Sequence, residues 1–575
     1  MMPEVTPNAR TVYVPFHREW HRLLFIVLLV LLTRGVMIAR TEVPSRDCLI
    51  FCRYARQLDQ PPLDPQNPAR RFSDAKEVIQ RSDHPPGFPF AIWGMGKLLS
   101  QIRGPLEPTD YIFAAQLVSA FAAIFMIFPH YWIGRRYLGA APAFWGTLLF
   151  AMIPVFAEVS SDGLSDTLYL ATITTAVWFA VAGNLAQNFR SALAWFTASG
   201  FACGVAFLIR PDALMVFGLI GLFLFIRMIM YIRTRVGAQA MIQGLAMLLG
   251  AILFAAPYVS VIGKLTNKRT GLGLLDYFLT GEMEKTFYQR AEPQESKLPG
   301  IVAQPFAAWY HQDKHGHLPK VVWALKALVQ EICKTSFYIL FCLSALALIF
   351  RFRQSMTRTG ILLLFLMVGY LVQLVYVSSM AGYLSQRHTL FPVMCMSFFA
   401  IQGFFLIGQW AAAIWKKGTP MLWTTIYLTI AVASTLPLNF KALHAHRVGH
   451  RAVGMWMYHH VPANAEVMDP FGWAKFYAGK SDLEFGFETL TVSYLLQNGY
   501  SPAEPNAEKF PRPYRGPVIY VVFEPNSKTS HSQLPYIAEV REFMKQGELV
   551  YQYPEDVPAN EAKVAVYRCP PSPEP

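Results

Sequence analysis

Ionisable side chains lie at the ends of long apolar segments in this sequence, where an unpaired charge is costly and is often functional. The first of them, Asp47, lies in SRDCLIFCRYARQL (45–58), directly after an apolar segment. If this stretch is helical, the residues on the same face as Asp47 are Phe51, Tyr54, Ala55 and Leu58. A carboxylate on such an apolar face must be paired, protonated or reactive, because desolvating a lone charge is unfavourable. A helix N-cap is the alternative role for Asp47, and we favour a functional one.

A histidine, His84, lies in the segment SDHPPGFPFAIW (82–93), later in the same predicted loop. The prolines of this segment fix the backbone and prevent a regular helix, which holds the histidine at the membrane surface. A single histidine is more often an ordinary surface or core residue. Its nearness to Asp47 in the loop favours a catalytic role.

Two aspartates one helical turn apart, Asp162 and Asp166, lie in EVSSDGLSDTLYL (158–170) at the predicted start of an apolar helix. For Asp162 we favour a helix-capping role, because a carboxylate at a helix N-terminus interacts favourably with the helix dipole. Asp166 falls deeper in the apolar helix, where a carboxylate is costlier. We therefore predict a functional role for Asp166.

Two arginines lie at the predicted outer ends of apolar segments, where a guanidinium typically pairs with an anion from the protein, a lipid or a substrate. Arg210, in LIRPDALMV, has Asp212 close by in sequence, so a structural ion pair is an equal alternative. Arg387 and the adjacent His388, in GYLSQRHTLFP, have no acidic residue near them in sequence. Arg387 is therefore the stronger candidate for binding a phosphate group.

One mechanism uses carboxylates, a histidine and unpaired cations, Arg387 above all, together at a membrane surface. A sugar carried on a polyprenyl phosphate presents its anionic head there, and its phosphate leaves without a general acid. Arg387, His388 and Arg210 would stabilise the charge that develops on the phosphate, while one carboxylate would deprotonate an acceptor hydroxyl. A hydrolase fits less well, because nothing in the sequence marks a paired acid and base. The candidates for catalysis are Asp47, Asp166 and His84, and we expect no divalent metal.

The elements that must position these residues are membrane-spanning helices. Hydrophobic residues make up 54% of the 575-residue chain, and charged residues make up 15%. A soluble core does not account for so many apolar segments close to the roughly 20 residues that a spanning helix needs. The predicted spans are 23–40, 111–133, 140–157, 164–183, 192–209, 213–231, 240–262, 336–350, 360–379, 389–411 and 419–438. No signal-peptide cleavage site follows the first of them, and we expect it to be retained.

The basic residues of the short loops predict the orientation of these spans. Lys and Arg residues, without an Asp or Glu among them, occupy the loops on one side: Arg135, Arg136, Arg190, Arg227, Arg233, Arg235, Arg351, Arg353, Arg358, Lys416 and Lys417. This is the positive-inside pattern. It assigns residues 1–22 to the cytoplasm and makes 23–438 a transmembrane domain with extracytoplasmic loops 41–110 and 263–335. The net charge of +13 thus reflects membrane orientation, and we expect no nucleic acid partner.

The C-terminal segment 440–575 differs from the spans, because it is polar and proline-rich. β-Branched runs at 517–523 and 564–567 predict strands, and the stretch 451–460 is helix-like. We expect a small extracytoplasmic α/β domain that lies against the membrane domain. The seven cysteines have no metal-like spacing, and we expect them to be structural.

In the same order along the chain, these motifs resemble those of the polytopic GT-C glycosyltransferases. That superfamily includes protein O-mannosyltransferases, lipid A aminoarabinose transferases and bacterial enzymes of the RgtA, RgtB, RgtC and RgtD type. The positions that carry the resemblance are Arg46, Asp47, Tyr54, Ala55, His84, Pro85, Pro86, Asp166, Arg210, Pro211, Asp212 and Arg387 to Pro392. They fall within residues 20–400. The sequence differs at His388, where a tyrosine is commoner, and at Cys48, where many relatives have a glutamate after the aspartate.

The resemblance implies an α-helical polytopic membrane protein with the GT-C fold, about 11 transmembrane helices and Asp47 as the catalytic base. It also implies a polyprenyl-phosphate sugar donor and an active site on the extracytoplasmic face of the bacterial inner membrane, among membrane lipids. The acceptor, whether lipid, glycan or protein, stays open. A membrane transporter or lipid flippase is the main alternative, which predicts charges near mid-span and two related halves. A structural scaffold is a further alternative, and it leaves Asp47 and Arg387 unexplained.

Overall fold

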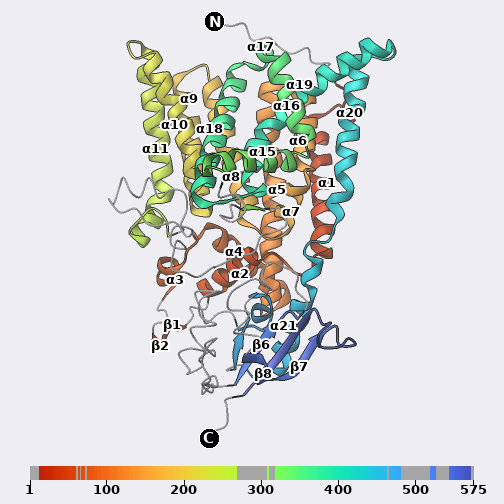
Figure 1. Ribbon diagram of the computed structural model, residues 1–575. Coiled ribbons are helices and arrows are strands. Elements are labelled where there is room, and N and C mark those ends of the chain that lie inside the picture. Colours follow the sequence, from red (N-terminus) through yellow and green to blue (C-terminus); the bar gives the residue numbers. More distant parts are fainter. Residues whose placement is uncertain are drawn as a thin grey trace.

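The computed structural model of the chain describes residues 12–59, 63–64, 67–71, 74–267, 307–309, 317–462, 465–469, 471–480, 518–525 and 543–570. Helices account for most of these residues (Figure 1). A bundle of long helices forms one end of the molecule, and a small sheet lies at the other end (Figure 1). Short helices lie between the two.

In the described part of the chain, nine helices are long and apolar enough to cross a membrane. Their bounds are α1 (Glu19–Arg40), α5 (Pro108–Leu138), α8 (Ser165–Leu185), α9 (Phe189–Ile209), α10 (Ala213–Met230), α11 (Arg235–Ile262), α18 (Arg358–Ala381), α19 (Leu390–Trp415, after the 3-10 turn η1, Gln386–Thr389) and α20 (Pro420–Thr435, which continues through η2, Leu436–Phe440, and η3, Ala445–Arg447). Two bent helix pairs raise the number of crossings to as many as eleven. The predicted polytopic helical fold is confirmed.

The remaining helices are shorter. Their bounds are α2 (Arg46–Asp59), α3 (Ala75–Arg81), α4 (Gly87–Arg103), α6 (Ala140–Ala151), α7 (Pro154–Ser161), α15 (Lys320–Thr335), α16 (Ile339–Phe350), α17 (Phe352–Ser355), α21 (Val448–His460) and α22 (Trp473–Tyr477). Two of the predicted spans correspond to bent pairs of these helices. α6 and α7 meet at 62°, and α15 and α16 meet at 107°.

Each bend has a local cause. Pro154 begins α7, and proline cannot donate the hydrogen bond that would continue α6. Between α15 and α16, Phe337 and Tyr338 have positive φ angles of 52° and 57°, which a right-handed helix does not contain. The span predicted at 336–350 is therefore the 12-residue α16, entered from α15 after a sharp turn.

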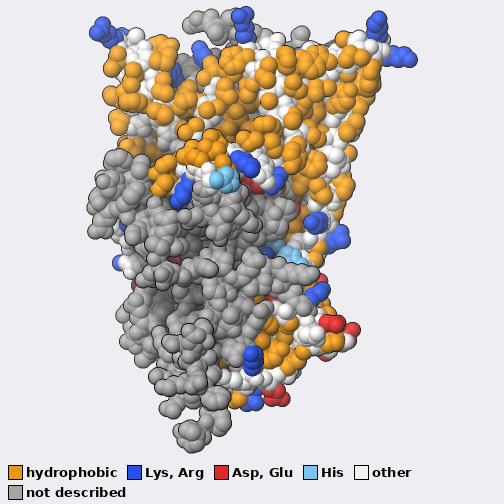
Figure 2. All heavy atoms as spheres, in the orientation of Figure 1, with side chains coloured by type: hydrophobic (Ala, Val, Ile, Leu, Met, Phe, Trp, Pro, Cys, Tyr) orange, Lys and Arg blue, Asp and Glu red, His pale blue; other side chains and the backbone are white. Residues whose placement is uncertain are grey.

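Large apolar side chains cover the outside of the helical bundle (Figure 2). Leu28 and Leu32 on α1, and Leu249 and Leu253 on α11, are among those most exposed. A surface of this kind is stable in contact with lipid tails rather than water. Lys and Arg side chains gather at the end of the bundle that carries the N-terminus, opposite the C-terminal sheet (Figures 1 and 2). The chain is an integral membrane protein.

The short helices α2 and α4 cover the sheet-facing end of the bundle, where α2 packs on α4 and α5 (Figure 1). α4 begins at Gly87, directly after the two consecutive prolines. A Cβ atom at Gly87 would lie 2.6 Å from the carbonyl oxygen of Leu208 at the end of α9, so only glycine allows this approach. The proline-rich segment is thereby held against the chain that leads to Arg210.

The C-terminal unit contains a four-stranded sheet in the order β5-β6-β8-β7. Its strands are β5 (Glu466–Met468), β6 (Ile519–Phe523), β7 (Glu548–Tyr553) and β8 (Val564–Cys569). Two antiparallel two-stranded ribbons lie outside this sheet: β1 (Leu63–Asp64) with β2 (Asn67–Arg71), and β3 (Ala307–Trp309) with β4 (Tyr383–Ser385). β5 and β6 are parallel, and the other neighbours are antiparallel. Val453 and Met457 of α21 pack on Val522 and Val566 of the sheet. The small α/β unit is present, and its strands β5 and β7 were not predicted.

Candidate active site

Asp47 lies in the first turn of α2, directly after the short connection from α1. The face of α2 that it shares is buried at Phe51, Tyr54 and Ala55, as the apolar pattern predicts. The Asp47 side chain itself is 34% exposed, so the apolar face ends at the carboxylate. Asp47 is therefore an acid that a substrate can reach.

The cysteine beside Asp47 is a packing residue. Cys48 is buried, and its Sγ lies 3.8 Å from that of Cys52. Burial, followed by the hydrogen bond with Cys52, raises the pKa of the Cys48 thiol well above its usual range. A thiol that stays protonated is a poor nucleophile.

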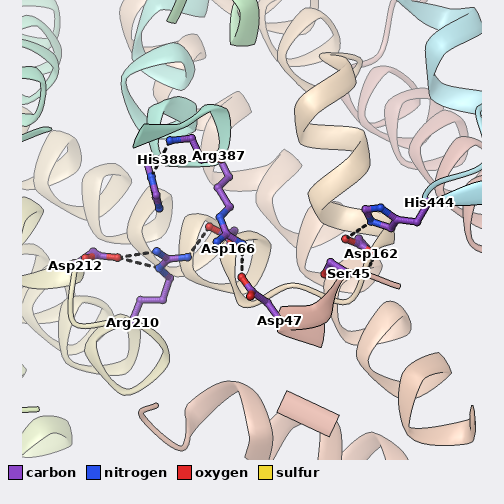
Figure 3. A network of polar contacts seen from close by, with 10 residues as sticks. Ser45, Asp47, Asp162, Asp166, Arg210, Asp212, Arg387, His388 and His444 are labelled. Atoms are coloured by element: carbon purple, nitrogen blue, oxygen red, sulfur yellow. Dashed lines mark hydrogen bonds and ion pairs between the residues drawn. The ribbon is translucent and has the colours of Figure 1, made fainter. Parts of the chain in front are cut away.

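Arg387, which is distant from Asp47 in the sequence, lies beside it in the structure. Its Nη1 donates to Oδ2 of Asp47 at 2.6 Å, although the two residues are 340 positions apart (Figure 3). The prediction that Arg387 is an unpaired cation was wrong, because its acidic partner is distant in sequence. Its Nε is nevertheless buried and donates to no acceptor in the described part of the chain. A buried donor left without a partner is unfavourable, and an anionic ligand would satisfy it.

Several hydrogen bonds hold the turn that carries Arg387. The backbone amide of Ser385 donates to Nδ1 of His388 at 3.3 Å, which completes a capping box around η1. The hydroxyl of Thr389 donates to that of Thr335 at 2.7 Å, and Thr335 also donates to the carbonyl of Gln386 at 3.2 Å. Helix α15 thus fixes the turn from which Arg387 extends.

Arg210 forms a second cluster beside the first. Its Nη1 donates to Oδ1 of Asp166 at 2.5 Å, and its Nε donates to Oδ2 of Asp212 at 2.9 Å (Figure 3). The Arg210 and Asp166 side chains are only 9% and 7% exposed. Both alternatives left open for Arg210 thus have a structural basis: it makes the ion pair with Asp212, and it lies in the same polar network as Arg387.

Asp162 has a different role from the N-terminal cap that we predicted. It lies after the last residue of α7, at the C-terminal end of that helix. Its Oδ1 accepts the backbone N–H of Ser45 at 2.8 Å, and its Oδ2 lies 3.1 Å from Nε2 of His444 (Figure 3). Asp162 therefore ties the entry of α2 to the chain that leaves the last span.

Gly163 makes this close arrangement possible. Its φ angle is 73°, in the left-handed region that favours glycine. A Cβ atom there would lie 2.7 Å from Sγ of Cys48 and 3.1 Å from Cβ of Ala115. The loop between α7 and α8 can therefore lie directly against the start of α2, which brings Asp166 into the same network as Asp47.

The two candidate histidines lie at the edges of the network. His388 points toward Arg210 in Figure 3, and its ring packs edge-on against Tyr383, with 5.5 Å between centroids. His84 packs edge-on against Phe51, with 5.0 Å between ring centroids. Phe51 is one turn beyond Asp47 on α2, so His84 lies close to the helix that carries the candidate base.

The structure therefore brings together Asp47, Asp166, Arg210, Arg387 and His388 in one network (Figure 3). His84 lies beside α2, against Phe51. The sequence reasoning missed Ser45 and His444. A backbone amide such as that of Ser45 leaves no signal in a sequence. His444 did leave one, because it opens the basic run HAHRVGH (444–450) at the end of the last span.

This arrangement can bind an anion and accept a proton at neighbouring positions. Arg387 and Arg210 supply positive charge, and Asp47 supplies an exposed carboxylate. Within the described ranges, no group of three or more His, Cys, Asp or Glu side chains is placed to hold a metal ion. The expectation of metal independence stays a prediction.

Residues 83–259 match the family model described as dolichyl-phosphate-mannose-protein mannosyltransferase. The matched stretch contains His84, Asp166 and Arg210, while Asp47 and Arg387 lie outside it. No curated protein sequence matches the chain.

Several solved membrane enzymes share the fold. ArnT from Cupriavidus metallidurans bound to undecaprenyl phosphate superimposes with a TM-score of 0.55 at 12% identity, covering 95% of this chain and 97% of that one. The Archaeoglobus fulgidus oligosaccharyltransferase tethered with an acceptor peptide gives a TM-score of 0.54 at 12% identity, covering 96% and 76%. The oligosaccharyltransferase AglB from the same organism, in complex with an inhibitory peptide and a dolichol-phosphate, gives 0.51 at 12% identity, covering 96% and 76%. The chain therefore has the fold of the GT-C glycosyltransferases, and residues 83–259 match the mannosyltransferase family model.

Proposed function

We propose that this protein is a membrane glycosyltransferase that moves a sugar from a polyprenyl-phosphate-linked donor to a lipid, glycan or protein acceptor. The observation that carries the proposal is the contact between Asp47 and Arg387, which places an exposed carboxylate 2.6 Å from a guanidinium that has a spare buried donor. Similar proteins bind undecaprenyl phosphate and dolichol-phosphate, which supports a donor of this class.

Arg387 is the proposed donor-phosphate ligand. The guanidinium offers planar, paired donors that match phosphate oxygens, and Nε of Arg387 is free to take one. Phosphate binding would compete with Asp47 for the same guanidinium. Without a donor, Arg387 holds the Asp47 carboxylate. Binding of the donor phosphate to Arg387 would displace Asp47 and leave its carboxylate free to act as a base.

Asp47 is the proposed general base. In the transfer step its carboxylate takes the proton from the acceptor hydroxyl, and the hydroxyl oxygen forms a bond to the anomeric carbon of the sugar. The bond between that carbon and the phosphate oxygen breaks, and the polyprenyl phosphate leaves with a second negative charge. Arg387 stabilises that charge as it develops. A single displacement of this kind inverts the configuration at the anomeric carbon.

The other candidates have supporting roles in this proposal. Arg210, clamped between Asp166 and Asp212, adds positive charge near the phosphate while staying fixed. His388 lies near both arginines and offers its Nε2 to the donor, because its Nδ1 accepts from Ser385. Asp166 sets the position of Arg210, and His84 helps to orient the acceptor hydroxyl beside α2.

We place the reaction on the extracytoplasmic face of the bacterial inner membrane, without a divalent metal. The support for the side is the position of the Lys and Arg residues at the opposite end of the bundle (Figure 2). The sugar and the choice among lipid, glycan and protein acceptors stay open in this proposal.

The charge positions favour a transferase over a transporter or flippase. Asp166 lies in the first turn of α8, Arg210 follows the last residue of α9, and Arg387 precedes α19. All three lie at span ends on one side of the membrane. A transport pathway needs polar groups near mid-span instead.

The test compares lipids, glycans and proteins by mass spectrometry in a strain that lacks the gene and in complemented strains. We expect one envelope component to lose the mass of a sugar in the deletion strain and to regain it with the wild-type gene. Asp47→Asn should not restore that mass. Asp59→Asn, which removes a carboxylate from the exposed end of the same helix, is the matched control and should restore it. A deletion strain without any change in glycosylation would contradict the proposal.

A further inference from the structure

The C-terminal unit is docked directly on the chain that leads into Asp47. The indole Nε1 of Trp473 donates to the carbonyl of Pro44 at 3.0 Å, and the hydroxyl of Tyr477 donates to the carbonyl of Glu42 at 3.2 Å. Arg451 on α21 adds an ion pair with the Glu42 carboxylate at 3.4 Å. The C-terminal helices therefore form one wall beside the candidate base.

One cation on this wall has no acidic partner among the described residues. Arg447, immediately before α21, lies with its guanidinium carbon 4.4 Å from the ring centroid of Trp473. Its Nε donates to Nε2 of His446 at 3.1 Å. Among the described residues, no carboxylate lies within ion-pair distance of Arg447, and its two terminal nitrogens have no acceptor. The aromatic ring holds the guanidinium in place without neutralising it.

The acids around Arg447 are engaged by other groups. The carboxylates within electrostatic reach are those of Asp162, Glu524 and Asp47, and Arg46 is the nearby cation. Each of the three acids has a basic partner of its own: Asp162 has His444, Glu524 has His450 at 2.5 Å, and Asp47 has Arg387. Arg447 is thus a half-buried charge whose partner is absent from this part of the protein.

The position of Arg447 relative to Asp47 indicates which ligand could pair with its charge. In Figure 3, Asp47 lies between the group of Arg387 and Arg210 on one side and the group of Asp162 and His444 on the other. Arg447 follows His444 by three residues, and Asp162 is the charged group with the largest electrostatic effect on it, so Arg447 belongs to that second side. In a displacement reaction the leaving phosphate and the attacking hydroxyl lie on opposite faces of the anomeric carbon. If Arg387 holds the leaving phosphate, the acceptor approaches from the side of Arg447.

We propose that Arg447 binds an anionic group of the acceptor substrate, a phosphate or a carboxylate, and so selects acceptors that carry one near the reacting hydroxyl. This inference rests on the proposed transferase function, because it defines the acceptor side by the donor side. Trp473 orients the Arg447 guanidinium before the acceptor binds. The contacts of the C-terminal helices with residues 42–44 fix the position of Arg447 relative to Asp47.

The test labels the arginines of the full-length wild-type protein in phosphatidylcholine nanodiscs with phenylglyoxal and follows each site by mass spectrometry. The probes are potassium phosphate and potassium acetate, compared with potassium chloride at equal ionic strength. We expect phosphate or acetate to slow labelling of Arg447 severalfold, with the stronger of the two identifying the preferred anion. Arg451, already paired with Glu42, should label at the same rate in all three salts. Equal labelling of Arg447 in all three would overturn the proposal.

Two further measurements separate this inference from the function on which it rests. Undecaprenyl phosphate should protect Arg387 from labelling, and failure there would count against the donor site, whatever Arg447 does. In transfer assays, Arg447→Ala should raise the KM for the acceptor about tenfold or more, the loss expected for one charge-assisted contact, and leave the KM for the donor unchanged. Arg568→Ala, at an exposed position of β8, is the control and should change neither. An unchanged acceptor KM in Arg447→Ala would show that the arginine only packs on Trp473.

Discussion

Two arginines of the polar network, Arg210 and Arg387, differ in how completely the protein satisfies them. Arg210 is 9% exposed and is held by two carboxylates, Asp166 and Asp212. Arg387 is 16% exposed and contacts one carboxylate, Asp47, which is itself 34% exposed. Its Nε has no acceptor among the described residues, whereas Nε and Nη1 of Arg210 each donate to a carboxylate.

This difference indicates a structural role for Arg210 and a ligand-binding role for Arg387. A buried ion triad with good geometry is costly to disturb, so Arg210 is suited to fixing the ends of α8, α9 and α10. A guanidinium with an unused donor and a solvent-accessible partner can exchange that partner for a ligand. We therefore assign donor binding mainly to Arg387 and positioning mainly to Arg210.

A third arginine shows that burial alone does not make a site. Arg34 of α1 is 1% exposed and donates to Ser160, Asn439, Thr33 and the carbonyl of Ala151. None of these partners is charged. Four of its five N–H groups make these bonds, which tie α1 to α7 and to the end of the last span, and burial keeps the side chain from a substrate.

The largest effect on stability should come from Arg210→Met. The substitution leaves Asp166 and Asp212 without their cation in a buried position, which costs about 3–5 kcal/mol. We expect a large fall in the melting temperature of the detergent-solubilised protein, or loss of the folded peak in size-exclusion chromatography. A variant with wild-type stability would show that Arg210 is not an anchor.

Arg387→Met should instead spare folding and weaken donor binding. Asp47 is partly exposed and can be hydrated when its partner is gone, so the stability loss should be about 1 kcal/mol or less. Loss of charge-assisted hydrogen bonds to phosphate should weaken undecaprenyl phosphate binding about ten- to hundredfold. Native mass spectrometry or a ligand-induced melting shift measures it. Arg387→Lys should recover part of the affinity, and unchanged binding in Arg387→Met would reverse the assignment.

Gly163→Ala should have a smaller effect on both clusters. The new Cβ must move Cys48 and adopt a left-handed backbone, which costs about 1–2 kcal/mol. We expect a moderate drop in transfer rate, because the start of α2 shifts away from Asp166. Gly35→Ala on α1 is the matched control, since a Cβ there meets nothing within 4 Å. Equal rates in Gly163→Ala and the wild type would show that this packing does not position Asp47.

Chelation should have the smallest effect. Our mechanism uses Arg387 and Arg210 in place of a cation bound to the phosphate, so we expect EDTA to leave the transfer rate unchanged. The control is re-addition of Mg²⁺ or Mn²⁺, which should not stimulate the rate. A rate that falls with EDTA and recovers with either ion would contradict the arginine-only site.

The helices of this fold could be predicted because each depends on its own sequence. Apolar runs of sufficient length predict the spans, and the periodicity around Asp47 predicts which face of α2 is buried. The bend between α6 and α7 arises at Pro154, and the bend between α15 and α16 arises at Phe337 and Tyr338, which have positive φ angles. The sequence prediction missed both bends, because the length of an apolar run does not show whether the helix bends within it.

The candidate site could be predicted only as a set of residues, because its contacts join distant segments. Arg387 was expected to lack a partner, since no acid is near it in sequence, and the fold supplies Asp47. Asp162 was expected to cap a helix, but it instead accepts a hydrogen bond from Ser45 and contacts His444. Each of these contacts crosses between separate parts of the chain, which local spacing cannot encode.

The central claim is that Asp47 acts on the acceptor and Arg387 acts on the donor. Asp47→Asn in the purified protein tests it most directly, with undecaprenyl phosphate binding and sugar transfer measured on the same preparation. We predict that transfer falls about a hundredfold to ten-thousandfold, the usual contribution of a general base. Binding of undecaprenyl phosphate should be retained or tightened, because Arg387 loses its competing partner. Wild-type transfer by Asp47→Asn, or loss of undecaprenyl phosphate binding with it, would contradict the account.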